Sequence, residues 1–184
     1  MTFTKYQFNN FCYWPSNPKK IVEFIGGSYL ASKPDLTYKR FIENLIHKNY
    51  AVHAFKYTPQ FDHQQLAIKA WKDFKNCRIS LSKRIGSSIP SIRIGHSLGC
   101  KLHLIAPDGG RNCEKFISIS FNNFSANKSI PLLKQIAQKL EFSSEFSPSP
   151  ERTLRMIEKT YSQKNNLLIK FNSDALDQTD KLLS

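Results

Sequence analysis

The sequence has no run of apolar residues near the roughly 20 that a membrane-spanning helix requires, and it has no concentrated basic segment. Residues 1–20 lack both the continuous apolar stretch and the small-residue cleavage site of a secretory signal. These absences predict a chain without a membrane span that is located in the cytoplasm.

Cysteine is also sparse, with four scattered residues and no pair at a CxxC or other metal-ligand spacing. Disulfide-stabilised domains contain cysteine at a much higher density. We therefore expect free thiols, no metal site and no cofactor.

The charge balance is strongly basic, with 27 Lys and Arg residues against 14 Asp and Glu and a net charge of +13. The basic residues are spread along the whole chain, which favours a compositional bias over a nucleic-acid-binding surface. Nucleic-acid or anionic-surface association stays open only as a minor alternative, resting on charge alone. The oligomeric state cannot be predicted from the sequence.

Short, almost continuously apolar segments alternate with amphipathic ones along the chain. The predicted strands are 20–24, 51–57, 91–95, 116–121 and 167–171, and the predicted helices are 36–48, 63–74 (capped by Asp62), 98–105, 132–140 and 151–161. This alternation predicts one α/β domain over residues 1–184, a mostly parallel sheet flanked by helices in a three-layer sandwich. The mixed segment 122–150, which ends in a Ser/Pro-rich stretch, is predicted to be a lid or insertion.

Residues 95–99 read Gly-His-Ser-Leu-Gly, a GxSxG sequence between a predicted strand and a predicted helix. In α/β-hydrolases this arrangement is a nucleophile elbow, which raises a serine hydroxyl on a sharp turn at the end of the sheet. We therefore predict Ser97 as a catalytic nucleophile. The alternative is an ordinary glycine-rich turn whose serine only caps the helix.

A serine nucleophile that attacks a carbonyl needs hydrogen-bond donors for the oxyanion that forms. The amide of Leu98, directly after the nucleophile, is predicted to be one donor, and Gly27 or Ser28 in the loop after the first predicted strand is predicted to supply the other. The glycine pair in that loop is equally compatible with a plain tight turn.

The acid of a catalytic triad is expected after the last predicted strand, where Asp174 stands, with Asp177 as the alternative. The triad histidine would come later still, but residues 178–184 contain none. His63, in a turn that could reach the same end of the sheet, is the candidate substitute base. His96 adjoins the nucleophile, although a side chain at that position does not normally reach the serine.

Several segments together resemble an α/β-hydrolase-like family of cyanobacteria and chloroplasts, domain of unknown function 1350. The segments that carry the resemblance are 25–28, 61–63, 95–103 (Gly-His-Ser-Leu-Gly-Cys-Lys-Leu-His), 120–124, 145–150 and 167–171, together with Asp174 and Asp177. The resemblance implies the α/β-hydrolase fold. It also implies that this chain is a C-terminally shortened member, without the last strand and helix.

Two functions follow as hypotheses. The first is a serine hydrolase or acyltransferase with an incomplete triad, acting through Ser97 on an ester, thioester or amide. The second is a catalytically inactive protein of the same fold that binds a small-molecule ligand or a partner, because no histidine follows the triad acid.

Overall fold

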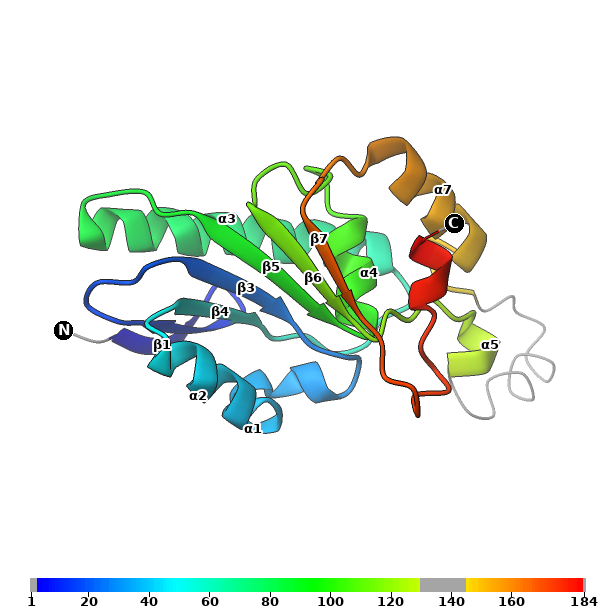
Figure 1. Ribbon diagram of the computed structural model, residues 1–184, viewed down its shortest axis with the longest axis horizontal. Helices are drawn as coiled ribbons and strands as arrows, with labels where there is room; N and C mark the ends of the chain where they lie inside the picture. The colour runs from blue at the N-terminus through cyan, green and yellow to red at the C-terminus, as the bar shows by residue number, and fades with distance from the viewer. Residues whose placement is uncertain (1–2, 130–144, 184) are drawn as a thin grey trace.

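The computed structural model describes residues 3–129 and 145–183, whose strands form one seven-stranded sheet in the order β1-β2-β4-β3-β5-β6-β7 (Figure 1). The strands are β1 (Phe3–Gln7), β2 (Asn10–Trp14), β3 (Ile21–Ile25), β4 (Ala51–Phe55), β5 (Ser91–His96), β6 (Lys115–Ile119) and β7 (Asn166–Ile169). The main helices are α1 (Pro34–Thr37), α2 (Lys39–His47), α3 (His63–Ile85), α4 (Leu98–Leu104), α5 (Ala126–Ser129) and α7 (Pro150–Thr160), with 3-10 turns η1 (Leu30–Ser32) and η2 (Thr179–Leu182).

The strands from β3 to β7 are parallel to one another, as predicted. An antiparallel hairpin, β1 and β2, extends the sheet beyond β4 and was not predicted. Its turn passes through Phe8 and Asn9, both with positive φ. Because all parallel strands point the same way, the loops that follow β3, β5, β6 and β7 gather at one end of the sheet, toward the right in Figure 1.

Helices cover both faces of the sheet, so the predicted three-layer arrangement is confirmed. On one face, Ile42 of α2 packs with Val22, Phe24 and Ile94 of the strands. On the other face, α3 and α4 bury a larger cluster that includes Ile25, Phe55, Leu66, Ala70, Phe74, Leu98 and Leu102. The four cysteines are buried free thiols, as expected from their spacing.

Two helices differ from the prediction. The segment predicted as one helix over 36–48 is split at Tyr38, whose φ of −111° and ψ of 22° separate α1 from α2. The helix predicted to end at Phe74 continues to Ile85 and stops at Gly86 in the left-handed region. Asp62 caps it as predicted, accepting a hydrogen bond from the Gln65 amide (2.9 Å). The predicted helix 132–140 lies outside the described residues.

Candidate active site

Ser97 is the single residue between the end of β5 and the start of α4. Its backbone has φ 55° and ψ −121°, in a region that a non-glycine residue rarely occupies. Its N–H donates to the carbonyl of Ile119 on the neighbouring β6 (2.9 Å), which holds the strained turn against the sheet. The chain therefore reverses sharply at Ser97, with the side chain at the carboxyl end of the sheet.

The two glycines of the motif leave room for this turn. A Cβ on Gly95 would come within 2.6 Å of the Cys100 backbone, and a Cβ on Gly99 would overlap the carbonyl of Ile25. No side chain fits at either place without moving α4 away from β3 and β5. The GxSxG spacing is therefore a steric requirement of the close packing between α4 and the two strands.

The loop after β3 lies against the elbow. A Cβ on Gly27 would be 3.3 Å from the Ser97 Cβ. The Gly27 amide donates to Tyr38 Oη (2.8 Å), and the same hydroxyl lies 2.8 Å from His96 Nδ1. A phenol that accepts from Gly27 has its own proton left to donate to His96, so Tyr38 connects the loop to the elbow. Sequence reasoning did not predict this role of Tyr38.

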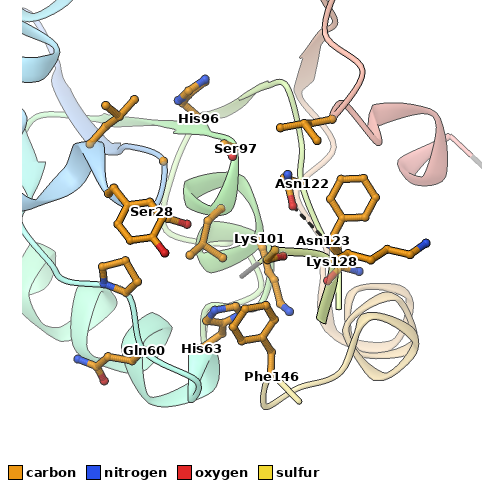
Figure 2. A pocket seen from close by; sticks show the side chains of 18 of the residues that line it. Ser28, Gln60, His63, His96, Ser97, Lys101, Asn122, Asn123, Lys128 and Phe146 are labelled. Carbon is orange, nitrogen blue, oxygen red and sulfur yellow. Dashed lines mark hydrogen bonds between the residues drawn. The ribbon is translucent and has the colours of Figure 1, made fainter. Parts of the chain in front are cut away.

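A cavity of about 620 Å³ opens beside Ser97 (Figure 2). Its walls are largely apolar and come from the loop after β3, the turn before α3, the elbow with α4, the segment 122–129, Phe146, and Leu176 in the loop after β7. Ser97 is at one end of this pocket, whereas the side chains of His63, Lys101 and Phe146 gather at the other (Figure 2). An apolar cavity with a few polar groups is typical of a small-molecule site.

Charged and polar groups at the far end of the pocket are deeply buried. Lys101 Nζ donates to the Pro148 carbonyl (3.0 Å), and burial lowers the pKa of Lys101 to about 8 although Glu145 opposes the shift. The His63 ring stacks on Phe146 with centroids 4.2 Å apart. Burial, followed by the charge of Lys101, lowers the pKa of His63 to about 3, so its imidazole is neutral near pH 7.

The five histidines occupy five different surroundings. His47 is exposed on α2, and His53 is buried on β4, 2.8 Å from Trp14 Nε1. His103 is buried on α4, where its ring stacks on Phe74. His63 and His96 both line the pocket, but His96 points away from its interior in Figure 2.

No residue in the described part of the chain, histidine or other, forms a hydrogen bond with Ser97 Oγ.

The two candidate acids follow β7 at the same end of the sheet. Asp174 Oδ1 accepts from the Leu176 amide (2.9 Å), and the Asp174 charge raises the pKa of His96 against the larger, opposite effect of burial. Asp177 Oδ1 accepts from the Thr179 amide (2.7 Å), while its Oδ2 is buried without a hydrogen-bond partner in the described part of the chain. Both carboxylates are therefore anchored by their own loop.

Residues 3–129 and 145–183 contain neither a group of possible metal ligands nor a membrane-crossing helix. No three His, Cys, Asp or Glu side chains there are grouped so that they could hold a metal ion. None of the helices in the same ranges has the length and apolarity that crossing a bilayer demands.

A family model described as "Protein of unknown function (DUF1350)" matches residues 6–184. The chain belongs to this family. The DUF1350 resemblance inferred from the sequence is thereby confirmed. No curated protein matches the chain.

Solved structures similar to the DUF1350 chain include several esterases and lipases. Esterase B from Lactobacillus rhamnosis has a TM-score of 0.67 at 12% identity, over 100% of this chain and 69% of that one. A monoacylglycerol lipase from Paleococcus ferrophilus has a TM-score of 0.54 at 12% identity, over 88% of each chain. TT1662 from Thermus thermophilus matches with a TM-score of 0.54 and 12% identity, over 100% of this chain and 93% of that one. The fold of the DUF1350 chain is therefore that of the α/β-hydrolases.

Proposed function

We propose that this DUF1350 chain is a serine hydrolase or acyltransferase in which Ser97 attacks the carbonyl of an ester, thioester or amide. The observation that carries the proposal is the strained backbone of Ser97 beside a largely apolar pocket. Strain of this kind is retained where the surrounding structure enforces it, often because the side chain must be presented to a ligand. The esterases and lipases that share the fold support the same reaction class.

The oxyanion would be held by two backbone amides. The amide of Leu98 begins α4 directly after Ser97. Because Gly27 has no side chain, its loop can lie close to Ser97, but the Gly27 N–H already donates to Tyr38. We therefore assign the second donor to the amide of Ser28, which also lines the pocket. Both amides would stabilise the negative charge that develops on the carbonyl oxygen.

We choose Asp174 as the acid, because its charge raises the pKa of His96, the residue directly before Ser97. His63 fits a base less well, since a group whose pKa is about 3 accepts a proton weakly at pH 7. We assign His63 to the pocket instead. Within a single domain, the described parts of the predicted lid 122–150, including Phe124 and Phe146, line the pocket, and we propose that these parts cover the site. The proposal needs no cofactor and assumes a cytoplasmic protein.

Fluorophosphonate labelling tests the nucleophile directly. We expect the folded chain to gain one phosphonyl group by intact mass, and the Ser97→Ala variant and heat-denatured protein to gain none. Ser28→Ala is the matched control, because it removes a pocket hydroxyl but keeps the proposed amide donor, and we expect it to be labelled. Equal labelling of Ser97→Ala and the parent chain would refute the assignment.

The second candidate function is ligand binding without catalysis. It is favoured by one observation: within the described residues, Ser97 Oγ has no hydrogen bond to a base. A folded chain that resists the fluorophosphonate yet binds a neutral ester in its pocket would support this alternative over the first.

A further inference from the structure

Two nitrogen-bearing side chains are buried at the end of the pocket opposite Ser97. Lys101 has an exposed fraction of 1% and His63 of 3%, and both line the cavity. Burying an ammonium group is costly unless a counter-charge or several hydrogen bonds compensate for the lost hydration. The partners of these two side chains therefore decide what the pocket is built to hold.

Lys101 is only partly compensated. Its ammonium has three donors, and one of them bonds to the Pro148 carbonyl. No carboxylate in the described residues forms an ion pair with it. Glu145 is near enough to act on its pKa, but that side chain is exposed and its Oε1 already accepts from the Ala126 and Phe146 amides. Donors on Lys101 thus remain for a ligand.

The hydrogen bonding of His63 is also incomplete. Its Nδ1 is buried and has no hydrogen-bond partner among the described residues. Phe146 covers one face of the ring, and Lys101 Nζ lies 5.9 Å from the centroid of the same phenyl ring. A neutral imidazole and an ammonium group therefore converge on one spot beside an apolar wall, as Figure 2 shows.

We propose that Lys101 and His63 form a subsite for a carboxylate at the far end of the acyl chain of the substrate. The inference rests on the proposed function, because it takes Ser97 as the place where the ester is attacked. Ser97 and Lys101 are four residues apart, about 6 Å along the axis of α4, so both belong to one wall of the pocket. The preferred substrates are monoesters or monothioesters of dicarboxylic acids.

A purely structural role for Lys101 would be to tether Pro148, and it would require a donor but no charge. Lys101→Gln separates the two roles, since a glutamine keeps an N–H donor and loses the positive charge. Lys128→Gln is the matched control. It removes the same charge from an exposed lysine that also lines the pocket.

The test measures binding in the Ser97→Ala background, where no turnover occurs. The two probes are monomethyl adipate, which is anionic, and methyl hexanoate, which is neutral. We expect adipate monoester to bind about ten- to a hundredfold more tightly, the usual range for a charged hydrogen bond. Lys101→Gln should abolish this preference, and Lys128→Gln should retain it. Equal affinities in the Ser97→Ala chain, or a preference that survives Lys101→Gln, would overturn the inference.

A second measurement needs no change at Lys101. Binding an anion beside an ammonium whose pKa is about 8 raises that pKa. At pH 8, calorimetry in buffers of different ionisation enthalpy should therefore show proton uptake with monomethyl adipate and none with methyl hexanoate. Absence of uptake would count against the subsite. Neither binding experiment requires catalysis, so failure of the labelling at Ser97 and failure of the carboxylate subsite are distinguishable.

Discussion

Tyr38 shows how one side chain can set the geometry of this site. Its hydroxyl accepts from the Gly27 amide and lies within hydrogen-bond distance of His96, while its ring packs edge-on against Phe24. Tyr38→Phe would keep the ring and remove both hydrogen bonds. We expect the rate constant of fluorophosphonate labelling at Ser97 to fall about tenfold, because the loop that carries Gly27 and the proposed oxyanion donor Ser28 is no longer held by Tyr38.

The control for Tyr38→Phe is Tyr29→Phe, which removes a hydroxyl from an exposed residue of the same pocket. We expect this variant to label at the parental rate. A merely structural role for Tyr38 would lower the urea midpoint and leave the labelling rate of the folded fraction unchanged. That result would contradict the positioning role.

At the level of single residues, the sequence predicts those roles that depend on neighbouring residues along the chain. Ser97 and its two flanking glycines could be found because the chemistry of the turn depends on five consecutive residues. Tyr38 and Lys101 could not be assigned their contacts in this way. The hydroxyl of Tyr38 meets an imidazole 58 residues away, and the ammonium of Lys101 meets a carbonyl 47 residues away. Such contacts are created only when the sheet brings its loops together.

At the scale of elements, the crossing of α4 over β3 depends on Gly99. An alanine there would overlap the Ile25 carbonyl, and backbone atoms of a central strand cannot easily move. We expect Gly99→Ala to lower the free energy of unfolding by about 3 kcal/mol. Gly86→Ala, at the end of α3, is the comparison: its φ is +72° and a Cβ there would meet open space. We expect Gly86→Ala to lower the free energy of unfolding by only about 1 kcal/mol, the cost of the left-handed backbone for a residue with a Cβ.

Urea unfolding at one pH measures both glycine variants. If Gly99→Ala cost no more than Gly86→Ala, the close approach of α4 to β3 would not be a constraint on the fold.

The elements that prediction missed have identifiable reasons. Helix α3 continues beyond Phe74 because Cys77 and Leu81 extend its buried face at helical spacing, a signal that was present in the sequence. The β1–β2 hairpin was harder to find, since residues 4–9 contain no buried position and so show no core-facing side of a strand. Its place in the sheet is fixed by pairing with β4, which is a tertiary contact.

For the whole molecule, the order of strands and helices was sufficient to predict a parallel sheet covered on both faces. That layering has an electrostatic consequence, because histidines from three different elements are buried in it. Burial lowers the pKa of His53, His63 and His103 to about 3 in each case. All three side chains must stay neutral while the chain is folded.

The stability of the molecule should therefore decrease on mild acidification. Between pH 6.5 and 3 the unfolded chain binds protons at these histidines that the folded chain does not. Each histidine therefore lowers the free energy of unfolding by up to about 1.4 kcal/mol for every pH unit by which the pH is lowered. Urea midpoints measured from pH 7 to pH 5 should show the decline. His103→Phe should make the slope shallower by removing one buried imidazole, whereas His47→Gln, on the exposed face of α2, should leave it unchanged. Identical slopes for the parent chain and His103→Phe would mean that the buried imidazole of His103 takes up no proton on unfolding.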